Sequence, residues 1–327
     1  MKLSIGIALL ICLHGSAALS QIIPTGVTDT SFSVQSAFRN DKKHFPGLTL
    51  ADSSMPAGIH VFKNLIYKKQ AAENLALDVY TPAEKREKPA AAVLMVHGGG
   101  WRSGNRSHNN TLARQLAARG FVAVTASYSL STHALYPEAV YDLKTAVRWM
   151  RANAKKFDID TSKIAILGFS AGGQLAALVG TTNGNALFEK DDEFKGISSR
   201  VQAVIDIDGT LAFIHPESGE GNDSKSISAA TYWFGYSKAE KPELWQQASP
   251  LNYAGKNTPP VLFINSSVSR MHAGRDDMIK KLNAFGVYSE VKTFPEAPHC
   301  FMFYTTWFEP TLNFVHAFLN RTFYSKK

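Results

Sequence analysis

From about residue 90 to the C-terminus, short apolar runs alternate with longer segments whose apolar residues recur at helical spacing. This alternation constrains the fold more than any other feature of the chain. Strands that alternate with helices of roughly 10–15 residues form a mostly parallel sheet with helices on both faces, so we predict an α/β fold. The expected strands are 60–67, 74–80, 91–96, 121–126, 163–167, 201–207, 261–265 and 288–294, and the expected helices are 111–119, 137–153, 171–179, 276–285 and 310–320.

Two stretches flank or interrupt this alternation. Residues 21–58 are mixed and polar with several prolines, and we expect them to form an N-terminal arm rather than a domain. Residues 209–258 form a long insertion that is polar at first and aromatic later. Long insertions on a rigid sheet often carry binding function. A single α/β domain with this insertion is therefore expected over 59–327.

The first 20 residues have the composition of a secretory signal peptide. Lys2 precedes an apolar run over residues 3–13, and small side chains end at Ser20. The run is shorter than the ~20 helical residues that cross a bilayer. We therefore expect a secreted or periplasmic protein that begins near Gln21 and has no membrane anchor after cleavage. The remaining chain has one cysteine, Cys300, which excludes an internal disulfide.

Charge and residue spacing exclude several classes of function. The formal net charge is +8 at pH 7, but no run of basic residues with interleaved aromatics indicates a nucleic-acid groove. The histidines do not have the spacing of metal ligands. We therefore expect no nucleic-acid partner, no metal and no organic cofactor.

The sharpest motif is GFSAG at residues 168–172, a G-x-S-x-G sequence between an expected strand and an expected helix. In that setting the serine lies on a tight turn that pushes its hydroxyl clear of the sheet, and the glycines leave room for the turn. The helix that follows points its first N–H groups towards developing negative charge. The motif predicts that Ser170 is a catalytic nucleophile.

A second motif, HGGGW at residues 97–101, directly follows the third expected strand. Glycines in such a loop let backbone N–H groups approach an oxyanion, together with the N–H of the residue after the nucleophile. We predict an oxyanion hole made by Gly99, Gly100 and Ala171. We also expect Trp101 to form a wall of the acyl pocket.

The general base is expected late in the chain, because the order in this fold is serine, acid and then histidine. His299 follows the last expected strand, where its loop reaches the same edge of the sheet as Ser170. His316 lies within the closing helix, and His272 precedes the helix at 276–285. We therefore predict His299 as the base.

These motifs, together with ASPL at residues 248–251, resemble the bacterial carboxylesterase branch of the α/β-hydrolase superfamily. That branch is related to the hormone-sensitive-lipase-like carboxylesterases and to the acetyl-xylan and feruloyl (BD-FAE) esterases. The resemblance covers roughly residues 59–320. It implies an α/β-hydrolase fold, a catalytic triad that includes Ser170 and His299, and esters of plant polysaccharides or similar small acyl groups as substrates.

The triad acid is where the sequence departs from that family. Such enzymes usually carry a histidine-glycine turn after the penultimate strand with an aspartate a few residues on, whereas residues 266–269 here are Ser-Ser-Val-Ser. We predict that Asp276 is the acid and that its loop folds back to His299. Asp277 beside it and Asp208, just past the preceding strand, are the alternatives.

Three side chains are predicted to contact substrate: Trp101, Trp233 in the aromatic part of the insertion, and Arg275. An arginine at the mouth of the site could clamp a carboxylate such as a uronic acid. The alternatives are that Arg275 pairs with Asp276 or Asp277 and that the aromatic side chains pack the insertion on the core.

Together these features predict a serine carboxylic ester hydrolase that removes acetyl or feruloyl groups from xylan or pectin. Its partner is expected to be a small-molecule or polysaccharide ester. Two alternatives are a peptidase of the same fold and a non-catalytic binding protein that has kept the fold. The absence of an acid at the usual position is the only feature that supports the binding protein.

Overall fold

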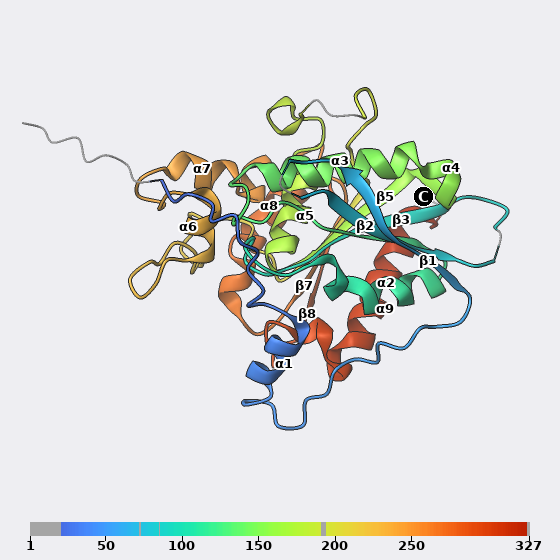
Figure 1. The fold of residues 1–327 in the computed structure, drawn as a ribbon, viewed down its shortest axis with the longest axis horizontal. Coiled ribbons are helices and arrows are strands. Elements are labelled where there is room, and N and C mark those ends of the chain that lie inside the picture. The colour runs from blue at the N-terminus through green and yellow to red at the C-terminus, as the bar shows by residue number, and fades with distance from the viewer. Residues whose placement is uncertain (1–20, 72, 85, 191–193, 326–327) are drawn as a thin grey trace, which may run out of the picture.

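The computed structural model describes residues 21–325 except for 72, 85 and 191–193, so the signal peptide expected over 1–20 lies outside the described residues. The described strands form one sheet in the order β1-β2-β4-β3-β5-β6-β7-β8 (Figure 1). Their bounds are β1 (Ile59–Lys68), β2 (Leu75–Pro82), β3 (Ala90–Val96), β4 (Val122–Ala126), β5 (Ile159–Phe169), β6 (Ala203–Ile207), β7 (Val261–Asn265) and β8 (Ser289–Thr293).

The sheet is antiparallel at one edge and parallel elsewhere. β1 pairs with β2 and β2 with β4 in antiparallel register, whereas β4, β3, β5, β6, β7 and β8 are parallel neighbours. The carboxyl ends of the six parallel strands therefore share one edge of the sheet. In open α/β sheets, ligands bind in the crevice outside this edge.

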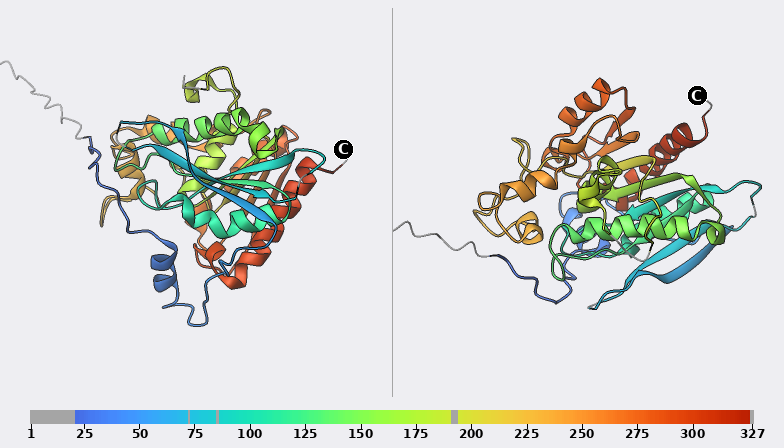
Figure 2. Two further views of the ribbon diagram at one scale, coloured as in Figure 1. Left: turned by 45° about the vertical axis from the view of Figure 1, so that its right-hand side comes forward. Right: turned by 90° about the horizontal axis from the view of Figure 1, so that it is seen from above.

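Helices cover both faces of the sheet (Figure 2). Side chains of α3, α5 and α8 belong to the apolar cluster on one face, and those of α2 and α9 belong to the cluster on the other. The α-helices are α1 (Val34–Asp41), α2 (Asn110–Ala118), α3 (Glu138–Ala152), α4 (Ala154–Phe157), α5 (Ala171–Thr181), α6 (Ala229–Phe234), α7 (Pro242–Gln247), α8 (Arg275–Ala284) and α9 (Thr305–Phe323). Short 3₁₀ helices lie at Arg106–Asn109, Ala186–Phe188, Pro250–Tyr253, Ser269–His272 and Phe301–Phe303.

The central strand β3 shows why these apolar runs are continuous. Leu94 and Val96 belong to one apolar cluster, and Val93 and Met95 belong to the other. All four side chains are fully buried. A strand that is covered by helices on both faces needs apolar residues at every position, which is the pattern of a parallel sheet.

Residues 21–58 run over the surface and contain α1, whose N-terminus is capped by the side chain of Ser33. Isolated bridges join Asp29 to Ser103 and Leu50 to Tyr304. This segment therefore contacts both the loop that follows β3 and the loop that follows β8. No helix among the described residues is long and apolar enough to cross a membrane.

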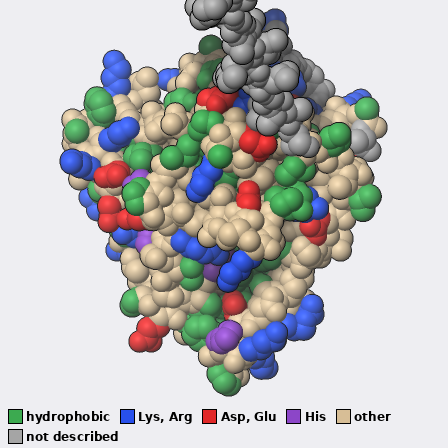
Figure 3. Space-filling model, turned by 90° about the vertical axis from the view of Figure 1, so that its left-hand side faces the viewer, with side chains coloured by type: hydrophobic (Ala, Val, Ile, Leu, Met, Phe, Trp, Pro, Cys, Tyr) green, Lys and Arg blue, Asp and Glu red, His purple; other side chains and the backbone are tan. Residues whose placement is uncertain are grey.

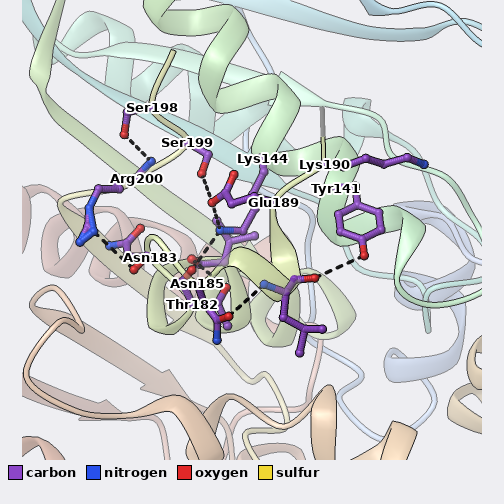
Figure 4. A network of polar contacts seen from close by, with 12 residues as sticks. Tyr141, Lys144, Thr182, Asn183, Asn185, Glu189, Lys190, Ser198, Ser199 and Arg200 are labelled. Atoms are coloured by element: carbon purple, nitrogen blue, oxygen red, sulfur yellow. Dashed lines mark hydrogen bonds and ion pairs between the residues drawn. The ribbon is translucent and has the colours of Figure 1, made fainter. Parts of the chain in front are cut away.

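Lys144, a buried lysine, holds the polar segment that follows α5 through hydrogen bonds (Figure 4). Lys144 of α3 donates from Nζ to Oε1 of Glu189 at 3.0 Å and to the carbonyl of Thr182 at 3.1 Å. The hydroxyl of Ser199 donates to the same carboxylate at 2.6 Å. Burial lowers the pKa of Lys144, and the charge of Glu189 opposes that effect.

The structure differs from the predicted elements in several places, among them the start of β5 at Ile159 rather than at residue 163. The closing helix begins at Thr305 rather than at residue 310, so Pro310 lies within α9. The insertion over 209–258 is not a plain loop, because it contains α6 and α7, which fold over the carboxyl edge of the sheet at the left of Figure 1.

Candidate active site

Ser170 lies on the sharp turn between β5 and α5. Its backbone has φ 57° and ψ −123°, a conformation that costs about 1–3 kcal/mol for a residue with a side chain. The flanking glycines are required by space: a Cβ at Gly168 would lie 1.9 Å from the carbonyl oxygen of Gly172, and one at Gly172 would lie 2.3 Å from that of Val96. The turn is held by a 2.8 Å hydrogen bond from the N–H of Ser170 to the carbonyl of Ile207.

His299 reaches Ser170 from the loop that follows β8. Its Nε2 is 2.9 Å from the serine Oγ, and its Nδ1 is 2.9 Å from Oδ2 of Asp208. The ring also packs against Phe169, with centroids 4.8 Å apart. With Nδ1–H donating to the carboxylate, Nε2 is free to accept the serine proton, which is the arrangement of a nucleophile, a base and an orienting acid.

Asp208 follows the last residue of β6 and is completely buried. Its φ of 51° turns the side chain at the strand end, and its Oδ1 accepts a 2.8 Å hydrogen bond from the N–H of Ser266. The loop after β7 therefore supplies a backbone donor to the acid instead of supplying the acid itself. One oxygen of the carboxylate is held by this loop, and the other orients His299.

The glycine loop after β3 lies beside Ser170, because a Cβ at Gly98 would be 3.0 Å from the Cβ of Ser170. A Cβ at Gly99 would lie 2.2 Å from the carbonyl oxygen of Ser103, and φ is 124° at Gly99 and 60° at Gly100. Within the described residues, no acceptor takes a hydrogen bond from the backbone N–H of Gly99, Gly100 or Ala171. Ala171 is also the first residue of α5. These three N–H groups are therefore available to an oxyanion.

His97 holds this loop in place from inside the protein. Its ring stacks on that of Tyr128 with centroids 4.4 Å apart, and the Tyr128 hydroxyl donates to the carbonyl of His97 at 3.0 Å. Burial lowers the pKa of His97 to about 3, so the ring is neutral. Its Nδ1 donates to the carbonyl of Gly98 at 2.9 Å, which holds the first peptide of the glycine loop in place.

The BD-FAE family model matches residues 77–272, which include the glycine loop, Ser170 and Asp208. This chain belongs to the BD-FAE family. His299 lies beyond the matched residues, so its place in the site rests on the hydrogen bonds described above. The predicted membership of the esterase branch of the α/β-hydrolases is thereby confirmed.

Curated proteins give a consistent result. Esterase LipC of Mycobacterium tuberculosis is 32% identical over 197 residues, which are 58% of this chain and 47% of LipC. An arylesterase of Saccharolobus solfataricus is 31% identical over 131 residues, 40% of each chain. The chain spans about half the length of LipC and of the mycobacterial relatives LipM and LipQ.

Solved structures confirm the predicted α/β-hydrolase fold. A truncated carbohydrate esterase from gut microbiota has a TM-score of 0.67 and 22% identity, over 83% of this chain and 98% of that one. Esterase 2 of Thermogutta terrifontis has a TM-score of 0.67 and 24% identity, over 84% of this chain and 98% of that one. A bifunctional GH43-CE protein of Bacteroides eggerthii has a TM-score of 0.68 and 25% identity, over 80% of this chain and 38% of that one.

The prediction that Asp276 is the acid of this BD-FAE protein is wrong. Asp276 lies in the first turn of α8 with 74% of its side chain exposed, and it accepts a 2.8 Å hydrogen bond from Nε of Arg275. Asp277 points elsewhere and lies 3.3 Å from His215. The 3₁₀ turn Ser269–His272 carries the chain directly into α8, so the loop does not fold back to His299.

The predicted substrate contacts of Trp101 and Trp233 are also wrong. The two rings stack with centroids 4.9 Å apart and an angle of 9° between their planes, and Trp233 is completely buried. Trp101 is 4% exposed and donates from Nε1 to Oε1 of Gln174 at 2.9 Å. Phe213 and Trp245 of the insertion pack in the same aromatic cluster, which covers the core.

Arg275 likewise does not extend towards a substrate. Besides Asp276, its Nη1 donates to Oδ1 of Asn265 at 2.8 Å. Its side chain is 18% exposed. The guanidinium therefore joins the end of β7 to the start of α8, and the prediction of a carboxylate clamp at this position is not supported by its contacts.

Sequence reasoning gave no role to Asp206, a second carboxyl group buried two residues before Asp208. Its Oδ1 accepts a 2.9 Å hydrogen bond from the N–H of Gly209, while Oδ2 has no partner among the described residues. Burial, and then the charge of Asp208, raise the pKa of Asp206 well above its usual range. Because two neighbouring buried carboxyl groups cannot both ionise at low cost, the carboxyl group of Asp206 stays protonated beside Asp208.

The replacement Asp206→Asn is expected to stabilise the protein increasingly as pH rises. The raised pKa means that the folded state holds a proton that the unfolded state releases near pH 4, so wild-type stability falls as pH increases above that point. Between pH 5 and 8 the difference in unfolding free energy between Asp206→Asn and wild type should increase with pH for as long as the pH stays below the raised pKa of Asp206 in the folded state. Urea denaturation at both pH values measures it. A difference that stays constant, or equal growth in Asp277→Asn, would contradict the assignment.

Proposed function

We propose that this protein is a serine carboxylic ester hydrolase. The observation that supports this most strongly is the unbroken chain of hydrogen bonds from Ser170 through His299 to Asp208. It lies beside backbone N–H groups that have no acceptor among the described residues. A nucleophile, an oriented base and oxyanion donors are the parts required for acyl transfer.

The proposed reaction has two steps. His299 takes the proton of Ser170 as the serine oxygen attacks the ester carbonyl, and the N–H groups of Gly99, Gly100 and Ala171 bind the developing oxyanion. His299 then gives the proton to the departing alcohol, which leaves an acyl group on the serine. Water then enters and gives a proton to His299 as its oxygen attacks the acyl carbonyl. His299 returns that proton to the oxygen of Ser170 as the bond between the acyl group and the serine breaks and the acid leaves. Asp208 stays ionised and stabilises the imidazolium in both steps.

For the substrate, we propose acetyl or feruloyl esters of plant cell-wall polysaccharides such as xylan or pectin. Membership of the BD-FAE family supports this choice. A carbohydrate esterase from gut microbiota shares the fold. Ser170 and His299 are partly exposed rather than enclosed, which suits an ester on a bulky chain. We also propose that residues 1–20 direct export, as the composition of that segment suggests, so that the enzyme meets such substrates outside the cytoplasm.

The purified protein is expected to hydrolyse p-nitrophenyl acetate and to release acetate or ferulate from a panel of xylans and pectins. Chromatography of the released acids measures the second activity. Turnover of p-nitrophenyl acetate without release from any polysaccharide would leave the esterase proposal in place and remove the polysaccharide proposal. A well-folded protein that turns over neither would favour a non-catalytic binding protein.

A further inference from the structure

Glu220 is a half-enclosed carboxylate that the catalytic chemistry does not use. It lies in the insertion, shortly before α6, and its side chain is 14% exposed. Its Oε1 is 3.7 Å from Nη1 of Arg270, which comes from the turn after β7. The backbone N–H of Ala230, in the first turn of α6, also favours the ionised form of the carboxylate. Two separate segments of the carboxyl edge therefore hold this one side chain.

The neighbours of Glu220 place it near the oxyanion loop. Ala229, adjacent to its partner Ala230, lies against the oxyanion loop, because a Cβ at Gly100 would be 2.9 Å from the Cβ of Ala229. Positive charge on His299 favours the ionised form of Glu220, so the imidazole is within electrostatic reach. Figure 3 views this end of the molecule, where acidic, basic and histidine side chains lie close together among apolar ones.

Burial has the largest effect on the pKa of Glu220 and raises it. Arg270, Ala230 and His299 lower this pKa, whereas the charge of Asp223 raises it. Arg270 is itself 55% exposed, and its stem packs on Gly219, where a Cβ would lie 3.0 Å from Cδ. Among the described residues its guanidinium makes one ion pair, with Glu220. A guanidinium has five N–H donors, so most of them face solvent or a ligand.

We propose that Glu220 and Arg270 bind hydroxyl groups of the alcohol half of the ester, and thereby select sugar esters over esters of simple alcohols. This inference rests on the proposed function and deepens it. His299 must give its proton to the leaving alcohol, so that half of the substrate lies on the side of His299, at the carboxyl edge of the sheet where the segments that carry Glu220 and Arg270 meet. The carboxylate accepts hydrogen bonds from sugar hydroxyls, and the guanidinium donates to their oxygens. The opposite charges suit a neutral polyhydroxy ligand rather than an anion.

A site of this kind discriminates through its unpaired groups. An alcohol that carries no further hydroxyl group leaves the remaining hydrogen-bond positions of Glu220 and Arg270 without the partners that a sugar supplies, and sites built to bind hydroxyl groups reject the deficient analogue strongly. A carboxylate that only stabilises the loop would behave differently, because its loss would lower kcat/KM for every substrate by the same factor. The two cases are separated by the ratio of kcat/KM for two acetyl esters that differ only in the alcohol.

The test uses wild type, Glu220→Ala and Arg270→Ala with a mono-O-acetyl methyl xyloside and with ethyl acetate. The ratio of the two kcat/KM values is expected to fall at least tenfold in Glu220→Ala and several-fold in Arg270→Ala. Glu243→Ala is the matched control, because it removes a carboxylate of the same insertion whose side chain is 64% exposed, and it should keep the wild-type ratio.

A ratio that stays within twofold of wild type in both variants would overturn the inference, and so would an equal loss on both esters. If Glu220→Ala does not fold, Glu220→Gln and the surface variant Arg270→Ala still decide the question. Wild-type protein that hydrolyses neither ester would instead contradict the proposed function, so the two failures are distinguishable.

Discussion

Ser170→Ala is expected to lower kcat for p-nitrophenyl acetate by about 10⁴- to 10⁶-fold, the largest effect of any single replacement in this protein. Removing the nucleophile of a serine hydrolase leaves only the catalysis that the oxyanion donors and binding supply. Alanine has the same Cβ as serine and meets the same steric limits at a φ of 57°, so the fold should be retained. Steady-state kinetics and a circular dichroism spectrum of the same preparation measure both.

The replacement also discriminates between the enzyme and a contaminating esterase. Residual activity in Ser170→Ala that is within tenfold of wild type would contradict the assignment of the nucleophile. Loss of the circular dichroism signal together with the activity would show only that the turn cannot accept alanine, and Ser170→Gly, which tolerates φ of either sign, then provides the comparison.

Asp208→Asn is expected to lower kcat by about 10⁴-fold with little change in KM. Asparagine keeps the shape of the side chain and can still accept from the N–H of Ser266. Its amide group, however, donates to Nδ1 of His299, which places the ring proton on Nε2. In that tautomer His299 cannot accept the proton of Ser170, and no anion stabilises the imidazolium.

The other two candidate aspartates provide the control for this prediction. Asp276→Asn and Asp277→Asn remove carboxylates that bond to Arg275 and His215, and each should keep kcat within about threefold of wild type. A severe loss of kcat in Asp276→Asn with little change in Asp208→Asn would mean that the loop after β7 supplies the acid after all.

The fold could be predicted from the sequence because its signals are local. β3, β4 and β7 are covered on both faces, and they appear in the sequence as unbroken apolar runs at nearly their observed bounds. The start of α9 could not be predicted in this way. A proline is typical of a first helical turn, yet Pro310 lies inside a helix that begins five residues earlier, where Thr305 bonds to the N-terminal segment at Thr49.

The site residues also fall into those that local motifs specify and those that long-range packing specifies. Ser170 and the glycine loop are specified by short motifs whose geometry is fixed within a few residues. The acid is specified by which strand end lies beside His299, and that depends on the packing of β6 and β7 and on the turn at Asp208, where φ is 51°. The available signal was that Asp208 directly follows a strand next to β5. The prediction of the substrate contacts was wrong for a related reason. Aromatic side chains such as Trp233 pack an insertion whose path over the sheet the sequence does not specify.

That Ser170 forms the acyl-enzyme is tested most directly by covalent labelling. Wild-type protein treated with a fluorophosphonate is digested and analysed by mass spectrometry. We predict one phosphonyl group per chain on the peptide that contains Ser170, no adduct in Ser170→Ala, and greatly slowed labelling in Asp208→Asn. A folded wild-type protein that takes up no label, or an adduct on a different serine, would contradict the assignment of Ser170, His299 and Asp208 as a working triad.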